Sequence, residues 1–444
     1  MSLLEKAAGT ATILRALPRQ RRIPFLSRDE LEQLRDLRVR ETVSYAAEHV
    51  PFYRDVFRSA GISPREIRRA DDLGRLPLIS REQVLRDPTR FRSDAREARD
   101  GVTLRSSGTT GVSLRLFHDR RSVLLNISYS ERERAVESAF VGKRFGYTRL
   151  FLAPEAVENV RRVRGLAAER SFRPFRPRYH VEPFQRPREE LLAAIERIRP
   201  DVLMGSGSVL EVFFRLAAAG GAPRHLPRVV LYGWDPMTAY GRELIEQTFG
   251  IPVLSRYSAM ECLKIGYFCE LRRGFHLHED LCHVQARGPD GLPVMAGESG
   301  ELVVSNLFNR GTVLLNYRLG DRGALSDAPC PCGRGTRVLV ELDGRVDDAI
   351  ALPDGGIVGA MGISAAVGAV PGILRFRLVQ RGATKFDLEL SLLEDADFEP
   401  TAEQAVAALR SALRACEIRP VHRQDIALAT GGKHRLVVPL RSAE

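Results

Sequence analysis

The most constraining feature of the sequence is a central stretch in which short apolar runs alternate with amphipathic segments of helical periodicity. In chain order these segments are 149–153, 189–198, 202–204, 209–218, 228–232, 239–249 and 252–256. Strands that alternate with helices of this length favour parallel pairing, because each return to a parallel neighbour requires a crossover connection. We therefore predict an α/β fold built on mostly parallel sheets.

The pattern changes along the carboxyl-terminal third of the chain. From residue 281 onward, strands are separated by turns, and a polar run at 343–348 is the best candidate for a domain boundary. Two further predicted strands and a helix follow it, at 374–379, 386–392 and 402–415. The 444 residues also exceed what one ordinary core encloses. We predict a large amino-terminal domain, residues 1–343, and a small, mobile α+β domain, residues 344–444.

The charge of the chain is strongly basic but does not by itself indicate nucleic-acid binding. The net charge is +11, and only five of the 67 basic residues are lysine. The arginines are spread along the whole sequence, and no nucleic-acid-binding motif accompanies them. No apolar stretch reaches the roughly 20 residues of a membrane span, and the amino terminus lacks a secretory pattern. We expect a cytoplasmic protein with small-molecule substrates and no nucleic-acid or membrane partner, and leave a homodimer open.

A loop rich in glycine and hydroxyl residues is the sharpest local signal. Arg105 is followed by Ser106, Ser107, Gly108, Thr109, Thr110 and Gly111. Such a loop leaves backbone N–H groups free to face an anion, and the hydroxyls can join them. It lacks the Gly-Lys-Ser/Thr ending of a Walker loop. A surface turn of similar composition is the alternative.

Three cysteines and a histidine have the residue types of a closed zinc site. Cys269 and His276 form a Cys-x₆-His pair, and Cys330 and Cys332 form a Cys-x-Cys pair. Together they match a tetrahedral Cys₃His set. The nearby residues His278, Cys282 and His283 compete as ligands, and ordinary buried thiols remain the alternative to a structural zinc site.

Five ordered motifs resemble those of the adenylate-forming (ANL) superfamily, and within it the phenylacetate–CoA ligase-like branch, which includes capsular-polysaccharide-biosynthesis-like proteins. They are Ser106–Gly111, Tyr257-Ser-Ala-Met-Glu261, Tyr317-Arg-Leu-Gly-Asp321, Gly344-Arg-Val-Asp-Asp348 and Gly432-Lys433. The segments Val50-Pro-Phe-Tyr53 and Leu76-Pro-Leu-Ile-Ser80 are similar to the opening of that branch. The resemblance covers essentially the whole chain.

The resemblance implies a ligase reaction in two steps. A carboxylic acid, aryl or otherwise hydrophobic, first attacks the α-phosphate of ATP in the presence of Mg²⁺, giving an acyl-adenylate and pyrophosphate. The acyl group then passes to coenzyme A. The alternative acceptor is an amine, a hydroxyl or a carrier protein. That alternative stays open because Leu352-Pro-Asp-Gly-Gly356 replaces the glycine-asparagine or glycine-arginine segment usual after the hinge.

The resemblance also implies a role for each matching residue. Ser106–Gly111 would hold phosphates, Glu261 would bind Mg²⁺, and Asp321 would accept hydrogen bonds from both ribose hydroxyls. Arg345 would contact ribose or phosphate, Asp347 would be the hinge, and the Lys433 ammonium would bridge the acid and the α-phosphate. The remaining matches would contact adenine or line the acid pocket: Gly205, Gly233, Trp234, Asp235, Pro236, Tyr257, Ser258 and Ala259. Some members of the branch bind structural zinc at the position of the cysteine–histidine set.

Overall fold

The computed structural model describes residues 3–106, 113–154, 158–172, 178–352, 357–413, 416–428 and 433–440. Its helices are α1 (Leu3–Arg22), α2 (Arg28–His49), α3 (Pro51–Ala60), α4 (Arg81–Arg86), α5 (Arg120–Tyr129), α6 (Glu131–Val141), α7 (Glu158–Arg170), α8 (Arg188–Ile198), α9 (Gly207–Ala218), α10 (Ala239–Thr248), α11 (Ala360–Gly368) and α12 (Phe398–Leu409). Its strands are β1 (Gly101–Arg105), β2 (Arg115–Asp119), β3 (Thr148–Ala153), β4 (Arg178–Pro183), β5 (Val202–Ser206), β6 (Val229–Gly233), β7 (Val253–Tyr257), β8 (Gly266–Phe268), β9 (Phe275–Leu277), β10 (Cys282–Arg287), β11 (Ser299–Asn306), β12 (Tyr317–Ser326), β13 (Val338–Arg345), β14 (Ile350–Ala351), β15 (Ile357–Val358), β16 (Ile373–Gln380), β17 (Lys385–Leu392), β18 (Glu417–His422) and β19 (Val437–Val438).

An eleven-stranded mixed sheet forms the centre of the larger part of the described chain. Its strand order is β10-β11-β12-β13-β9-β8-β7-β6-β5-β3-β4. The strands from β4 to β7 pair in parallel, as the alternation of strands and helices predicts. From β7 to β10 the pairing is antiparallel, in the region where turns separate the strands. The α/β class is confirmed, and both halves belong to one hydrogen-bonded sheet.

The helices begin where short polar side chains can satisfy free backbone N–H groups. Ser27 and Glu30 form a reciprocal capping box at the start of α2, and Ser80 with Gln83 does the same for α4. The Ser80 cap sets the start and the direction of α4. It therefore places Arg81, the first residue of this helix, at the edge of the site described below.

Apolar side chains pack on both faces of the parallel half of the sheet. One face carries Phe151, Met204 and Leu231 into the largest core, which also receives α2 and α3. The other face carries Leu152, Leu203 and Val230 against α9 and α10. Burial on both faces explains why the sequences of these strands are continuous apolar runs, without the alternation of apolar and polar residues that a half-exposed strand has. The carboxyl ends of β5, β6 and β7 lie side by side at one end of this parallel half.

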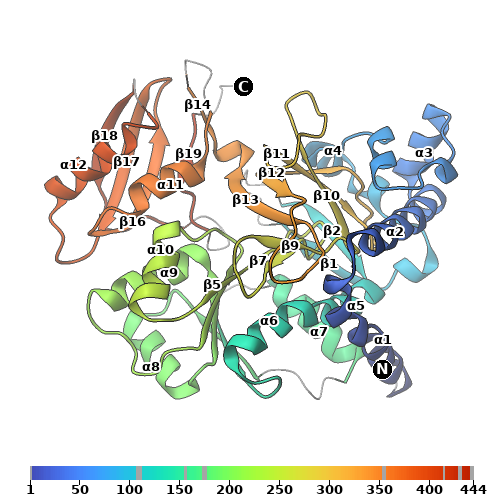
Figure 1. Cartoon of the computed structure of the whole chain (residues 1–444), viewed down its shortest axis with the longest axis horizontal. Helices are drawn as coiled ribbons and strands as arrows, with labels where there is room; N and C mark the ends of the chain where they lie inside the picture. Colours follow the sequence, from blue (N-terminus) through green and yellow to red (C-terminus); the bar gives the residue numbers. More distant parts are fainter. Residues whose placement is uncertain are drawn as a thin grey trace.

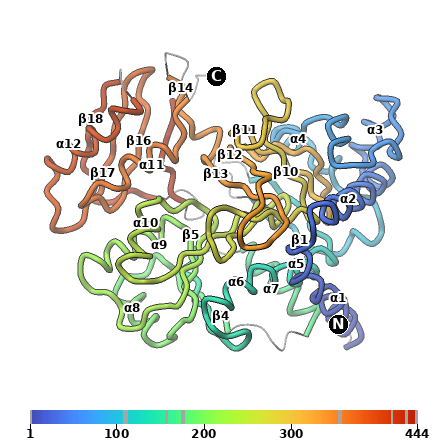
Figure 2. The backbone as a smooth tube through the Cα atoms, viewed as in Figure 1, coloured from blue at the N-terminus to red at the C-terminus, as the bar shows by residue number. Residues whose placement is uncertain are grey.

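The carboxyl-terminal part has its own sheet and its own core. Strands β16, β17, β18 and β19 form a four-stranded sheet in the order β18-β17-β16-β19, and α11 and α12 pack against it. This unit lies beside α9 and α10, on the opposite side of the molecule from α2 and α3 (Figures 1 and 2). Strand β13 continues to Arg345, so the boundary predicted after residue 343 lies inside this strand, before its last two residues. The division into domains 1–343 and 344–444 remains a prediction.

Among the described residues, no helix combines the length and the apolar character that crossing a bilayer requires.

Candidate active site

The predicted phosphate loop connects two antiparallel strands. Arg105 of β1 pairs with Arg115 of β2, and the Ser106 amide donates to the carbonyl of Leu114 at 2.9 Å. The hydroxyl of Ser106 accepts hydrogen bonds from both terminal nitrogens of Arg81 at 3.3 Å. The loop therefore follows a strand and precedes a strand, as the sequence indicates. The other predicted loop residues, Ser107, Gly108, Thr109, Thr110 and Gly111, lie outside the described residues.

Three of the predicted residues meet where β7, β12 and β13 come together. The Tyr257 hydroxyl, at the end of β7, donates to Oδ2 of Asp321 at 2.7 Å. Arg345 lies opposite Asp321 in the β12–β13 ladder, with its Nη1 atom 3.5 Å from Oδ1. Gly320 has a φ of +73°, and a Cβ there would lie 3.1 Å from the Arg345 guanidinium. Glycine before Asp321 therefore gives both the turn of the backbone and the space for the arginine.

The electrostatic environment of Asp321 suits a hydrogen-bond acceptor. Burial raises the pKa of its carboxyl above the ordinary value, while Arg345, Tyr257 and Lys433 each oppose that rise. Burial also raises the pKa of Tyr257 well above its ordinary value, with Asp321 adding to the effect. The tyrosine therefore stays protonated and acts as a donor, which orients the carboxylate toward the open side of the site.

Glu261 lies in a loop that two hydrogen bonds hold in place. Its carbonyl accepts from the Asn306 amide at 2.7 Å, and the carbonyl of Met260 contacts Nε2 of His118 at 2.9 Å. The Glu261 residue is 9% exposed, and burial raises the pKa of its carboxyl although Arg81 and the Tyr317 hydroxyl oppose the rise. A nearly buried carboxylate beside the phosphate loop is a fitting single ligand for Mg²⁺, which takes one or two carboxylates and completes its shell with phosphate oxygens and water.

Lys433 reaches this site from the carboxyl-terminal part of the chain. Burial lowers the pKa of its ammonium below the ordinary value, while Asp235, Asp321 and Glu261 oppose the change and Arg345 adds to it. These charges surround the ammonium although they come from four different segments of the sequence. The charges of Asp321, Glu261 and Arg345 thus act on Lys433, whose role in the site remains a prediction. Gly432 lies outside the described residues.

The predicted pocket wall lies at the carboxyl ends of neighbouring parallel strands. Gly205 precedes the end of β5, Gly233 ends β6, and Ser206 pairs with Gly233. Trp234 has a φ of +68°, is 44% exposed, and stacks on Phe151 with ring centroids 4.6 Å apart. Ser258 and Ala259 follow β7 at the same edge, where ligands bind in open α/β sheets.

Asp235 does not point into this pocket. Its carboxylate accepts hydrogen bonds from the backbone and hydroxyl groups of Ser208 at the start of α9, and from the backbone N–H of His434 at 3.1 Å. In the same segment, the backbone of Pro236 packs closely against Gly207.

The predicted hinge residue lies where the central sheet ends. Asp347 is exposed within a short 3₁₀ turn, Val346–Asp348, that follows β13. The next residue, Asp348, forms an ion pair with Arg435 at 2.8 Å. The turn is therefore held to the segment that carries Lys433, while Asp347 itself faces solvent.

Arg81 is a site residue that the sequence reasoning missed. It contacts Ser106, and its charge acts on both Glu261 and Tyr317. The only feature of the sequence that could have indicated Arg81 is its position directly after the Ser80 cap, at the first residue of α4. In a chain with so many arginines, that position alone did not distinguish it.

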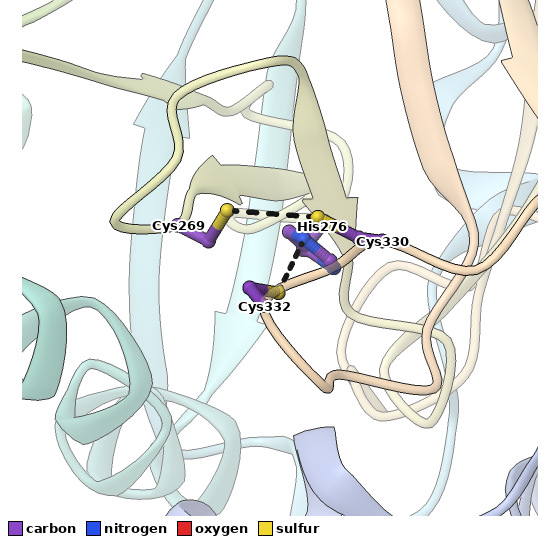
Figure 3. Close-up of side chains that lie close together, drawn as sticks. All are labelled: Cys269, His276, Cys330 and Cys332. Carbon is purple, nitrogen blue, oxygen red and sulfur yellow. Dashed lines mark hydrogen bonds between the residues drawn. The ribbon is translucent and has the colours of Figure 1, made fainter.

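The three cysteines and the histidine of the predicted zinc set lie together (Figure 3). Their ligand atoms are all within 4.8 Å of one another, with Cys269 Sγ 4.0 Å from Cys330 Sγ and Cys332 Sγ 3.3 Å from His276 Nε2. Tetrahedral zinc with Zn–S bonds near 2.3 Å places two sulfurs roughly 3.8 Å apart. Nδ1 of His276 contacts the Thr336 hydroxyl at 2.8 Å, which leaves Nε2 to face the sulfurs. The donor set and its spacing fit a closed metal site.

Two of the competing ligands, Cys282 and His278, contact other partners, and His283 is not part of the cluster. The Cys282 thiol donates to backbone carbonyls of Lys264 and His278. The His278 ring lies between Glu133 and Arg132, and burial lowers the pKa of His278 to about 4. Among the described residues, the cluster is formed by Cys269, His276, Cys330 and Cys332.

Comparison with known proteins finds relatives along most of the chain, although no protein-family model matches it. The chain is 27% identical over 345 residues to a phenylacetate–coenzyme A ligase of Thermus thermophilus, covering 75% of this chain and 74% of that protein. It is 29% identical over 350 residues to the phenylacetate–coenzyme A ligase of Escherichia coli, covering 74% of each. The protein CapK of Staphylococcus aureus is 20% identical over 376 residues, covering 83% of this chain and 80% of CapK.

Solved structures share the fold over nearly the full length. A 2-hydroxyisobutyryl-CoA ligase in the postadenylation state, in complex with 2-HIB-AMP, superimposes with a TM-score of 0.76 at 19% identity, covering 96% of this chain and 92% of that one. The same ligase in the thioesterification state, with 2-HIB-AMP and CoA, gives a TM-score of 0.59 at 20% identity, covering 95% and 91%. The motifs, the relatives and the fold together support the assignment of the chain to the adenylate-forming superfamily, on its phenylacetate–CoA ligase-like branch.

Proposed function

We propose that the protein is an AMP-forming acid–CoA ligase: it activates a carboxylic acid with ATP to an acyl-adenylate and transfers the acyl group to coenzyme A. The observation that carries this proposal is that the Lys433 ammonium, from a separate part of the chain, is acted on by the charges of Asp321 and Glu261. An ammonium near carboxylates at the end of a parallel sheet is suited to hold two anionic reactants together.

In the first step, each group acts on a different part of the nucleotide. Asp321, oriented by Tyr257, accepts hydrogen bonds from the vicinal ribose hydroxyls. Arg345 and Arg81 contribute positive charge near the sugar and the phosphate loop. Lys433 neutralises the acid carboxylate and an α-phosphate oxygen, which brings them within bonding distance. Glu261 would hold Mg²⁺, which supplies neutralisation of the phosphate charge.

The acid is expected to be aryl or otherwise hydrophobic. Trp234 is 44% exposed, stacks within 18° of parallel on the buried ring of Phe151, and presents a flat aromatic surface beside the ends of β5 and β6. A surface of this kind favours a planar apolar group.

The acceptor is expected to be coenzyme A, which the names of the phenylacetate–CoA ligase relatives support. A second candidate keeps the adenylation step and uses an amine, a hydroxyl or a carrier protein instead. The observation that favours it is Leu352-Pro-Asp-Gly-Gly356, which replaces the usual glycine-containing segment after the hinge. In both cases we place the boundary of the mobile domain near residue 343 and its hinge at Asp347, and we place the reaction in the cytoplasm, where ATP is abundant.

We also propose that Cys269, His276, Cys330 and Cys332 bind a structural zinc ion. The site lies between β8, β9 and the loop before β13, about 100 residues before Lys433 in the sequence. A closed set of four protein ligands leaves no position for substrate, so the ion would join these loops rather than take part in the reaction.

The deciding experiment measures pyrophosphate release from ATP over a panel of acids, with and without coenzyme A. Release that depends on an aryl acid, followed by thioester formation, is the expected result. Absence of release with every acid would refute the enzyme assignment. Release without any thioester would favour the second candidate. Elemental analysis of the purified protein, expected to give one zinc per chain, tests the metal site.

A further inference from the structure

The Asp235 carboxyl connects three segments that are distant in the sequence. It is 9% exposed, and it accepts hydrogen bonds from Ser208 N at 3.2 Å, from the Ser208 hydroxyl, and from His434 N at 3.1 Å. Ser208 belongs to the first turn of α9, and His434 directly follows Lys433. A buried carboxylate that bonds backbone N–H groups is strongly directional, because such charge-assisted bonds are about twice as strong as neutral ones. Asp235 therefore determines where the backbone next to Lys433 lies.

His434 is held on its other side as well. Its Nε2 contacts the backbone carbonyl of Phe376 in β16 at 2.7 Å. Burial lowers the pKa of this imidazole to about 4, so the ring is neutral and Nε2 carries the hydrogen that it donates. The residue after Lys433 is thus bonded to the β6–α10 loop by its backbone and to the carboxyl-terminal sheet by its side chain.

A second attachment lies two turns further along α9. Arg215 is 6% exposed and bonds Glu211 on the same helix. It also donates to the carbonyl of Ile373 at 2.8 Å and to that of Gly368 at 2.7 Å, at the end of α11. Ser208, Glu211 and Arg215 lie on one face of α9, since their spacing of three and four residues follows the helical period. This face holds the carboxyl-terminal unit in the orientation in which His434 reaches Asp235.

The Lys433 ammonium lies within electrostatic range of the same carboxylate. Among the charges that act on Lys433, Asp235 opposes the lowering of its pKa more strongly than Asp321 or Glu261 does. Asp235 thus acts on the lysine twice, by holding the adjacent backbone and by attracting the ammonium. The loop that the resemblance assigns to adenine binding thus carries a side chain bonded to the residue after Lys433.

We infer that Asp235 is a positioning residue for the first half-reaction, because through His434 it determines where the Lys433 ammonium lies. Arg215 holds the carboxyl-terminal unit in the orientation in which His434 can bond Asp235. This inference rests on the proposed adenylation function. It predicts that substitution of Asp235 affects the two half-reactions differently. The contacts of Asp235 with the Lys433 segment serve acyl-adenylate formation and not thioester formation from a supplied adenylate.

The test compares both half-reactions in Asp235→Ala and Asp235→Asn. Loss of a charge-assisted hydrogen bond costs about 1.5–3 kcal/mol, so Asp235→Ala should slow acyl-adenylate formation roughly 10–100-fold. Asp235→Asn keeps one acceptor oxygen and should recover part of that rate. Thioester formation from supplied acyl-adenylate should change less than about twofold. Asp425→Asn is the matched control, since that carboxylate lies near His434 and pairs with Arg375 at 3.1 Å without bonding the His434 amide.

A readout independent of activity is the chemical reactivity of Lys433. Limited acetylation followed by mass spectrometry reports all five lysines in one experiment. Asp235→Ala should raise the labelling rate of Lys433 several-fold and leave that of Lys143 and Lys385 unchanged. Equal loss of both half-reactions, or unchanged labelling of Lys433, would overturn the inference. If the wild-type protein activates no acid, the proposed function fails, while the labelling experiment still decides whether Asp235 positions the lysine.

Discussion

The Tyr257 hydroxyl donates a hydrogen bond of 2.7 Å to Asp321, joining the end of a parallel strand to an antiparallel one. The two residues belong to separate motifs and are 64 positions apart. Their contact lies where the parallel half of the sheet gives way to the antiparallel half, and Lys433 reaches the same place from the carboxyl-terminal unit. The proposed chemistry is thus assembled at the junction of three structural units.

Removing the Tyr257 hydroxyl should weaken ATP binding more than it slows turnover. In Tyr257→Phe the ring stays, but Asp321 loses the donor that orients it and opposes the rise of its pKa. We expect the KM for ATP to rise roughly five- to tenfold, as for one lost buried hydrogen bond. Steady-state kinetics with ATP varied gives the measurement. Tyr45→Phe, which removes a hydroxyl bonded to Ser93 elsewhere, should leave that KM unchanged.

Truncating Lys433 should separate the two half-reactions. Lys433→Ala removes the ammonium that brings the acid to the α-phosphate, so pyrophosphate release should fall at least about 100-fold. Thioester formation from supplied acyl-adenylate should persist. Lys385→Ala is the control, because that lysine pairs with Glu417 on the surface. Equal loss of both steps in Lys433→Ala would contradict the role proposed for the lysine.

The pH dependence of adenylation should show the ionisation of Asp235. Burial raises the pKa of Asp235 to about 6, although Ser208, the His434 N–H and Lys433 oppose this rise. Arg375 and Tyr232 are the other ionisable neighbours of Asp235. As the pH falls below about 6, the carboxylate becomes neutral and its attraction for Lys433 is lost. We expect the rate of adenylate formation to decline there in the wild type. In Asp235→Asn the rate should be lower at pH 7 and should lack this decline.

The same raised pKa predicts a gain of stability when Asp235 is neutralised. A carboxyl whose pKa is higher in the folded than in the unfolded protein favours folding while it is protonated, and this contribution is lost as the pH rises through about 6. Asp235→Asn should therefore be as stable as the wild type at pH 7, or more stable by roughly 1–2 kcal/mol. Denaturant titration at pH 5 and pH 7 measures the difference. A large loss of stability at pH 7 would show that the carboxylate serves mainly to hold the fold.

The buried ion pair between Arg132 and Asp280 should be essential for folding. Both terminal nitrogens of Arg132 bond Asp280 at 2.7 Å. Burial alone would raise the pKa of Asp280, but the guanidinium outweighs it and holds that pKa below its ordinary value. Its stabilising contribution is therefore present above pH 4 and is lost as the pH falls through the lowered pKa. Asp280→Asn should lower the free energy of unfolding by about 3–5 kcal/mol, whereas Asp327→Asn, in an exposed pair with Arg337, should cost less than about 1 kcal/mol.

Removal of the predicted zinc ion should destabilise the loops around β8 and β13 without acting directly on catalysis. Cys332→Ser replaces one of four ligands and should lower both the zinc content and the melting temperature. Removal of zinc from the wild-type protein with a chelator should also lower its melting temperature. Cys262→Ser, outside the cluster, should retain the metal. A full complement of zinc in Cys332→Ser would exclude this ligand set.

Local patterns in the sequence were sufficient for the alternating elements of the central stretch and for the cysteine and histidine set. The alternating segments between 149 and 256 predicted β3 and β5–β7 with α8–α10, because the period of apolar residues depends only on neighbours along the chain. The cysteine and histidine set was also predictable, since ligand types and spacing are visible without a fold. The resemblance of five short motifs added the roles of Asp321, Glu261 and Lys433.

Only the tertiary structure decided which of these residues meet. Sequence order does not reveal that β13 pairs between β9 and β12, which brings Cys332 to His276 and Arg345 to Asp321. Nor does it show that Arg81 reaches the phosphate loop, or that Asp235 faces His434 rather than the nucleotide. Local periodicity is set by interactions between residues a few positions apart, whereas these contacts depend on how distant strands order themselves and how two cores pack together.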